Sequence, residues 1–251
     1  MKIYNKHHFV NAPKAVLIDL DNTLYNYDLA HAEAMKALEK KFFDTLKIPA
    51  KLFYFYYLKS REKIQKNLKN TASSHSRLLY IQNMFEYIGL GSSISLVSSF
   101  EQTYWNNFLL NIELFEGAED FLNDLRMLSI PIVLITDLSS HVQFRKLISI
   151  GLDTYFDYIV TSEESGAEKP SDLPFRMALQ KLNFKEVKDV WMIGDRLDLD
   201  IKGSKKAIGA TTILKKDKRF SRDSDVRYMD ASFYRYKDLR NLLSKLNTNN
   251  E

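Results

Sequence analysis

The stretch Ala15-Val16-Leu17-Ile18-Asp19-Leu20-Asp21-Asn22-Thr23 decides the fold of this chain. Its first four residues form a short apolar run, which is typical of a buried strand. Two carboxylates, Asp19 and Asp21, follow directly at the point where this strand would end. We therefore predict a strand over residues 15–18 with an acidic pair at its carboxyl end.

An acidic pair in this position has more than one interpretation. Two carboxylates two residues apart can hold a cation together while one stays free for nucleophilic or acid/base work, which suggests phosphoryl-transfer chemistry. Asp and Asn are also common in ordinary turns, because their side chains hydrogen-bond nearby backbone groups. A calcium loop of the EF-hand type is excluded, because Leu24 stands where that loop needs Gly and Ala30 stands where it needs Glu.

Residues 28 to about 110 have the pattern of amphipathic helices. Apolar side chains recur at every fourth position, with polar residues between them, as in Ala30, Ala34, Leu38 and Phe42. Breaks at residues 48–49, 70–76 and 89–93 divide the segment into about four helices. We expect the aromatic run at residues 53–57 to pack inside this helical bundle rather than to form a ligand-stacking surface.

After Gly117 the pattern changes, and short apolar runs alternate with helical patterns. The apolar runs lie at residues 132–135, 158–160, 190–193 and 211–214, and the helical patterns lie at about 118–128, 139–149, 173–183 and 198–207. This alternation predicts an open parallel sheet covered by helices on both faces, to which residues 15–18 add one more strand. We expect an α/β core over residues 1–24 and 112–251, with a helical domain inserted over residues 25–111.

Chemically active side chains follow several of the predicted strands. Thr136-Asp137 follows the strand at 132–135, and the loop after the strand at 158–160 contains Glu168-Lys169-Pro170. The strand at 190–193 is followed by Gly194-Asp195-Arg196-Leu197-Asp198-Leu199-Asp200. Ligands of open parallel sheets bind outside the carboxyl ends of the strands, so we expect these groups to converge on one edge. Mg²⁺ suits such an edge, because it needs only a few carboxylates besides waters and a phosphate.

The set of motifs resembles the haloacid dehalogenase superfamily of phosphotransferases over about residues 14 to 240. The four family motifs match, in order, Asp19, Asp21 and Thr23; Thr136; Lys169; and Gly194, Asp195 and Asp200. The helical insertion is similar to the family's C1-type cap. The resemblance therefore implies a Rossmann-like open parallel sheet with an inserted all-helical cap domain.

The resemblance also implies roles for the site residues. Asp19 would be the nucleophile that forms an aspartyl-phosphate, and Asp21 the general acid/base; the dehalogenase branch of the family lacks this second Asp. Thr136 and Lys169 would act on the phosphoryl group. Mg²⁺ would be bound by Asp19, by the backbone carbonyl of Asp21 and by Asp195, with Asp200 ligating through water or orienting the loop.

Asp137 departs from the family pattern, because many relatives have Asn at this position. A carboxylate so close to a phosphoryl site would be repulsive unless it points away or pairs with a cation, and Arg196 is one candidate partner. We count Asp137 among the candidate substrate-binding residues with its side-chain role open. Asp198 we interpret as structural.

The function that the resemblance implies is that of a Mg²⁺-dependent phosphatase. Its substrate would be a small phosphomonoester, of the sugar phosphate or nucleoside monophosphate class. Two alternatives stay open: a sugar phosphomutase of the same superfamily, and a related binding protein that has lost catalysis.

Composition sets further bounds on the function. The chain has 251 residues, of which 45% are hydrophobic and 27% charged, and it has no cysteine, which excludes thiolate chemistry and disulfides. Neither a signal peptide nor an apolar run near the ~20 residues of a membrane span is visible, so we expect a cytoplasmic protein without a membrane partner. The late basic cluster is interpreted as a solvated face rather than as a nucleic-acid site. It consists of Lys205, Lys206, Lys215, Lys216, Lys218, Arg219 and Arg222.

Overall fold

The computed structural model describes residues 1–91, 93–184, 189–217 and 226–248. The chain divides into two compact units. The α/β unit consists of Met1–Asn26 and Leu114–Glu251, and the helical unit consists of Tyr27–Glu113. The chain thus crosses between the units after residues 26 and 113, two residues later than expected at each crossing.

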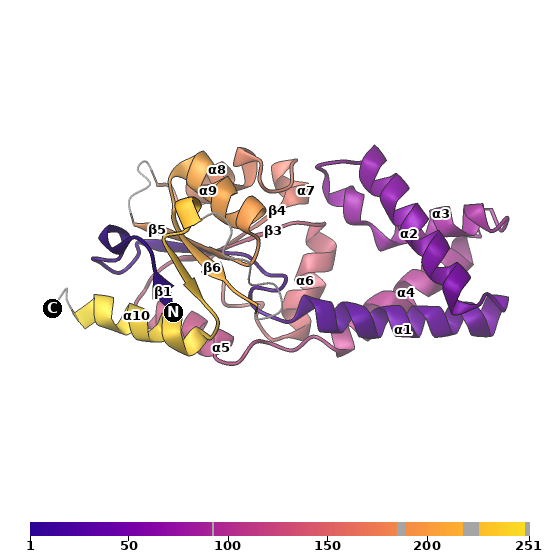
Figure 1. Ribbon diagram of the computed structural model, residues 1–251, viewed down its shortest axis with the longest axis horizontal. Helices are drawn as coiled ribbons and strands as arrows, with labels where there is room; N and C mark the ends of the chain where they lie inside the picture. The colour runs from indigo at the N-terminus through magenta and orange to yellow at the C-terminus, as the bar shows by residue number, and fades with distance from the viewer. Residues whose placement is uncertain (92, 185–188, 218–225, 249–251) are drawn as a thin grey trace. The chain divides into compact units, whose positions relative to one another are not determined.

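A seven-stranded sheet forms the centre of the α/β unit (Figure 1). Its strands are β1 (Lys2–Ile3), β2 (Ala15–Ile18), β3 (Ile132–Thr136), β4 (Tyr158–Thr161), β5 (Val190–Gly194), β6 (Thr211–Lys215) and β7 (Ala231–Phe233). They lie in the order β1-β7-β6-β5-β2-β3-β4, and every neighbouring pair is parallel except β1 with β7. The predicted open parallel sheet and its five expected strands are confirmed, whereas the short strands β1 and β7 were not expected.

Helices cover both faces of this sheet. They are α5 (Ala118–Met127), α6 (Ser140–Ser149), α7 (Ser162–Ser165), α8 (Asp172–Lys181), α9 (Lys202–Ile208) and α10 (Tyr236–Thr248). In Figure 1, α8 and α9 lie on one face, and α5 and α10 lie on the other. The helix expected at 198–207 is wrong in its first half, because Leu197–Ile201 forms a π-helical turn before α9 begins.

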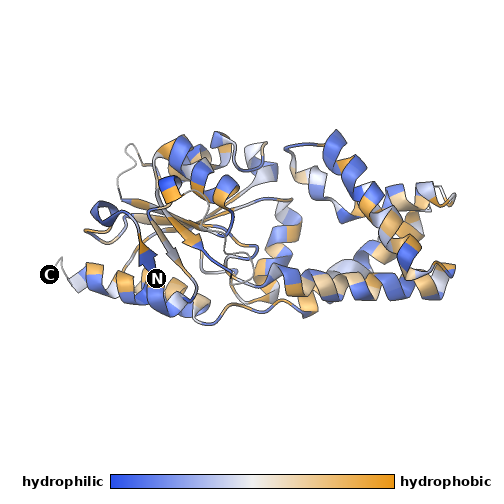
Figure 2. Cartoon of the chain, in the orientation of Figure 1, coloured by the Kyte–Doolittle hydropathy of each residue, from blue (hydrophilic) through white to orange (hydrophobic). Residues whose placement is uncertain are grey.

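The strands nearest the centre of the sheet form its core. All four residues of β2 are completely buried, and Leu17 lies beside Val133 of β3 and Met192 of β5 in the sheet register. Phe175 of α8 packs against these side chains in one apolar cluster. Figure 2 shows the hydrophobic colour concentrated on these strands. Burial of this apolar surface contributes roughly 25 cal/mol per Å² to stability, and it holds the neighbouring strands in one register.

The helical unit contains α1 (Tyr27–Leu46), α2 (Ala50–Asn67), α3 (Arg77–Tyr87) and α4 (Ile94–Leu110), with a 3-10 turn over Ala72–His75. Aromatic rings form its core, and the ring centroids of Phe42 and Phe100 lie 4.4 Å apart. The aromatic run packs into this core only in part, because Phe53 and Tyr57 are buried whereas Phe55 is 56% exposed. In the described part of the chain, no helix has the length and apolar character needed to span a bilayer.

Candidate active site

Three neighbouring strands bring the motif residues to one edge of the sheet. Strand β2 lies between β3 and β5 and runs parallel to both. Asp19 follows β2, Thr136 ends β3, and Asp195 follows β5. The backbone N–H of Asp19 also donates to the carbonyl of Ile193, at 2.9 Å, so the first and fourth motifs are joined directly.

Three aspartates form an acidic cluster at this edge. Oxygen atoms of Asp19, Asp195 and Asp200 lie within 4.8 Å of one another, and both Asp19 and Asp200 are buried. Lys169 joins two of them: its Nζ donates to Asp19 Oδ1 at 2.6 Å and to Asp200 Oδ1 at 2.7 Å. The hydroxyl of Thr23 donates to the other Asp19 oxygen, at 2.9 Å. The Asp19 carboxylate is therefore held in one orientation.

The electrostatics of the cluster favour a bound cation. Burial raises the pKa of Asp19 to about 7, although the charge of Lys169 opposes this shift. Burial, together with the charges of Asp19 and Asp200, raises the pKa of Asp195 to about 9. One ammonium group thus does not balance three crowded carboxylates. An all-oxygen donor set with excess negative charge fits a hard divalent cation such as Mg²⁺.

Backbone geometry after β5 places Asp200 in the cluster. The N–H of Arg196 donates to Asp200 Oδ2 at 2.9 Å, across the π-helical turn. Gly194 leaves the space for this side chain, since a Cβ atom at residue 194 would lie 2.4 Å from Asp200 Cγ. Asp198 of the same turn points elsewhere: it is exposed and pairs with Lys202 at 2.8 Å.

Asp21 lies outside the acidic cluster and has partners that the sequence did not indicate. Its Oδ1 and Oδ2 accept hydrogen bonds from Lys146 Nζ, at 2.8 and 2.9 Å. The hydroxyl of Tyr25 also donates to Asp21 Oδ1, at 2.6 Å. Lys146 comes from α6, 125 positions along the chain, and its side chain is completely buried.

The end of β3 is also held by α6. Gln143 donates from Nε2 to the Thr136 hydroxyl oxygen, and to the carbonyl of Asp137 at 2.6 Å. Asp137 Oδ1 accepts the backbone N–H of Lys169 at 3.0 Å, so this carboxylate ties the second motif to the third. Within the described residues no ion pair joins Asp137 to Arg196, which is exposed.

The described members of the basic cluster are engaged separately. Lys205 pairs with Asp230 at 2.6 Å, and the Lys206 ammonium lies 5.7 Å from the Tyr228 ring centroid. Lys215 lies 3.8 Å from the ring centroid of Phe115. Three members of the cluster, Lys218, Arg219 and Arg222, lie outside the described residues.

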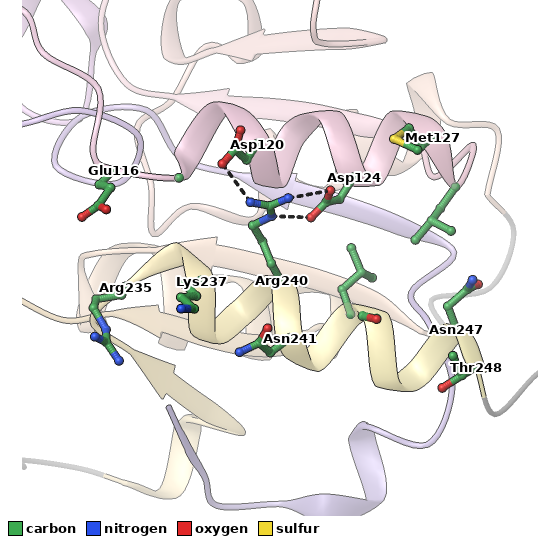
Figure 3. A pocket seen from close by; sticks show the side chains of 14 residues that line it. Glu116, Asp120, Asp124, Met127, Arg235, Lys237, Arg240, Asn241, Asn247 and Thr248 are labelled. Carbon is green, nitrogen blue, oxygen red and sulfur yellow. Dashed lines mark hydrogen bonds and ion pairs between the residues drawn. The ribbon is translucent and has the colours of Figure 1, made fainter.

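A groove with a cavity volume of about 790 Å³ lies between α5 and α10, away from the acidic cluster (Figure 3). Its acidic and basic lining residues balance one another. Arg240 is neutralised by Asp124, at 2.6 Å, and by Asp120, at 2.8 Å. The acidic cluster gathers the motif residues, so it is the candidate active site.

The chain is similar to known proteins over most of its length. Residues 13–207 match the family of haloacid dehalogenase-like hydrolases. The chain is 32% identical to a ribulose-1,5-bisphosphate 5-phosphatase of Halopiger xanaduensis, over 80% of this chain and 83% of that protein. It is 25% identical to a glyceraldehyde 3-phosphate phosphatase of Methanocaldococcus jannaschii, over 93% of this chain and 98% of that protein.

Among solved structures, the hydrolase YfnB of Bacillus subtilis has the same fold. It superposes with a TM-score of 0.69 at 22% identity, over 93% of this chain and the whole of that chain. The protein therefore belongs to the haloacid dehalogenase-like hydrolases.

Proposed function

We propose that the protein is a Mg²⁺-dependent phosphatase that hydrolyses a small phosphomonoester through an aspartyl-phosphate on Asp19. One observation carries the proposal: a buried carboxylate, oriented by Lys169 and Thr23, stands beside two further acids at the carboxyl edge of the sheet. The two curated relatives are phosphatases by name, which supports the same reaction class.

In the first step, a carboxylate oxygen of Asp19 attacks phosphorus and the bond from phosphorus to the ester oxygen breaks. Asp21 gives its proton to the leaving oxygen. Gln143 donates to the Thr136 oxygen, which orients the hydroxyl so that its own hydrogen can be donated to a phosphoryl oxygen. Lys169 supplies the positive charge beside Asp19 and the incoming phosphate.

In the second step, a water molecule attacks the same phosphorus and gives its proton to Asp21. The bond from phosphorus to the Asp19 oxygen breaks, so inorganic phosphate leaves and both carboxyl groups return to their starting states. The division replaces one difficult displacement by two easier ones.

The acidic cluster would hold Mg²⁺. The ligands would be the Asp19 carboxylate, the Asp21 backbone carbonyl and Asp195, with Asp200 ligating through water or orienting the loop. When bound, the ion offsets the repulsion between Asp19 and the phosphate and stabilises the charge that develops on the oxygens. Lys169 donates to both Asp19 and Asp200, and its positive charge reduces the repulsion between these two carboxylates.

The helical unit would act as the cap that selects the substrate. The helical unit begins close to the site in the sequence. Its first connection to the α/β unit follows Asn26, five residues after Asp21. The substrates named for the two relatives are phosphorylated sugars, so we place the substrate of this enzyme in the sugar phosphate class. Nucleoside monophosphates belong in the same substrate panel as the second class.

The test is phosphate release from a panel of phosphorylated metabolites, with and without Mg²⁺. Asp19→Asn should lower the rate by at least about a thousandfold, whereas Asp198→Asn, the same change at an exposed residue of the same edge, should leave it near the parent value. Asp21→Asn should slow turnover and retain an acyl-phosphate on Asp19. Equal rates for Asp19→Asn and the parent protein would refute the proposal, and formation of an isomeric sugar phosphate without phosphate release would favour a mutase.

A further inference from the structure

Helix α6 buries two polar side chains beside the apolar Leu147, and it leaves two large apolar side chains exposed. The side chains of Gln143 and Lys146 are completely buried, whereas Phe144 is 46% exposed and Ile148 is 66% exposed. A surface helix normally turns its apolar residues inward and its charged residues outward. Departures from the normal pattern of buried apolar and exposed polar residues are expected at functional sites, where polar groups are needed for binding or catalysis.

The buried polar residues of α6 lie on one side of the helix and serve two different motifs. They are three positions apart, which places them next to each other on the helix surface. Gln143 donates to Thr136, and Lys146 donates to both oxygens of Asp21. One helix thereby fixes the hydroxyl that would bind the phosphoryl group and the carboxyl group that would move the proton.

The energy of burial argues against a purely structural reason for Lys146. Removing an ammonium group from water costs several kcal/mol, and its pairing with a carboxylate often does no more than offset that cost. A Met or Leu at residue 146 would fill the same volume without the penalty. The lysine is therefore explained by what it does to Asp21, and its contribution to stability does not explain it.

We propose that Lys146 is a positioning residue that holds the Asp21 carboxyl group in the orientation needed for proton transfer. The proposal rests on the phosphatase function proposed above. The Asp21 side chain is 29% exposed and would otherwise sample several rotamers. Lys146 and Tyr25 fill three of its four acceptor positions in the described part of the chain, which leaves one on Oδ2 for the travelling proton.

The test compares two phosphate esters that differ in their need for a proton. The alkoxide of glycerol 1-phosphate must be protonated as it leaves, whereas the nitrophenolate of p-nitrophenyl phosphate leaves without a proton. Because kcat/KM reports formation of the phosphoenzyme, Lys146→Met should lower kcat/KM for glycerol 1-phosphate by about 10- to 100-fold. The value for p-nitrophenyl phosphate should fall by less than about threefold, because that step does not use the Asp21 proton.

Lys205→Met is the matched control. Lys205 likewise pairs with an aspartate, Asp230, at 2.6 Å, but Asp230 lies at the amino end of β7, on the opposite edge of the sheet. Its removal should leave the ratio of the two kcat/KM values unchanged. A loss of activity that is equal for both esters in Lys146→Met would show a general structural role and would overturn the proposal.

A double-variant cycle tests whether Lys146 acts through Asp21. In the Asp21→Asn background, Lys146→Met should cause no further fall in kcat/KM for glycerol 1-phosphate, and an additive fall would contradict the proposal. Should Lys146→Met fail to fold, Tyr25→Phe removes the hydrogen bond from the second donor to Asp21 and should change the ratio in the same direction; an unchanged ratio would overturn the proposal. If the parent protein cleaves neither ester, the proposed function itself fails, which is a different result from an active parent with an unchanged ratio.

Discussion

Replacement of Gly194 by alanine tests how the acidic cluster is assembled. The backbone of Gly194 has no positive φ, so the added methyl group is not opposed by backbone conformation. It is opposed by contact, since the new Cβ would lie 2.4 Å from both Cγ and Oδ2 of Asp200 and 2.5 Å from its Cβ. Asp200 is buried and held by Lys169 and by the Arg196 N–H, so it can move only by breaking these hydrogen bonds.

The loss of stability in Gly194→Ala has two causes, which are overpacking around the new methyl group and the loss of a hydrogen bond to Asp200. Overpacking of a buried site costs about 1–3 kcal/mol, and the loss of one charge-assisted hydrogen bond costs about 1.5–3 kcal/mol. We expect Gly194→Ala to destabilise the α/β unit by about 3 kcal/mol. For a chain of this size that corresponds to a fall of roughly 10 °C in its unfolding temperature.

Thermal unfolding followed by circular dichroism measures the loss, and Mg²⁺ titration measures the damage to the cluster. The Mg²⁺ concentration for half-maximal phosphatase activity should rise at least about tenfold, because Asp200 no longer faces Asp195. Gly203→Ala is the graded control, since its Cβ would meet Phe175 and Pro170 only at 3.1 Å. If Gly194→Ala and Gly203→Ala shift the unfolding temperature equally and leave the Mg²⁺ requirement unchanged, the steric argument is wrong.

Three further predictions concern stability and its dependence on pH. Burial and the charges of two arginines lower the pKa of His31 to about 4, so folding favours its neutral form. The free energy of unfolding should therefore fall as pH falls from about 6.5 to 4. In urea unfolding, His31→Gln should show a smaller fall in the free energy of unfolding over this range than the parent protein. The pKa values of Asp19 and Asp195 are raised to about 7 and about 9, so without metal their protonated forms stabilise the fold and this stability is lost as pH rises from about 4 to 9. Added Mg²⁺ should therefore raise the unfolding temperature more at pH 8.5 than at pH 5.5, and a larger rise at pH 5.5 would contradict the assignment. Tyr236→Phe removes a buried hydrogen bond of 2.7 Å to the Thr23 carbonyl and should cost about 1 kcal/mol, measured as a lower denaturation midpoint.

The sheet was predictable because its strands are short, continuous and apolar. The five expected strands lie within one residue of the observed ones, because most of their residues are buried and apolar. The strands β1 and β7 have two and three residues, too few for a periodic pattern to identify. The helix expected at 198–207 failed at its start for a similar reason, because the periodicity of side chains does not distinguish a π-helical turn from an α-helix.

The groups that meet at the carboxyl edge of the sheet could be predicted from the sequence. Parallel strands in one sheet end at the same edge, so residues that directly follow each strand, such as Asp19 and Asp195, must come together whatever the details of packing. The meeting of Asp19 and Asp195 at this edge follows from that rule, whereas Asp200 joins them through the turn after β5.

The hydrogen bonds that hold these groups depend on how distant elements pack together, so they could not be predicted from the sequence. Lys146 reaches Asp21 from a helix 125 positions away, and a lysine that follows Arg145 on a helix is expected to be exposed to solvent until the packing of α6 is known. The contact of Asp137 with the Lys169 backbone likewise depends on two loops meeting in space. The positions of the strands along the chain can be predicted from local pattern, but the partner of a side chain is set by how the elements pack.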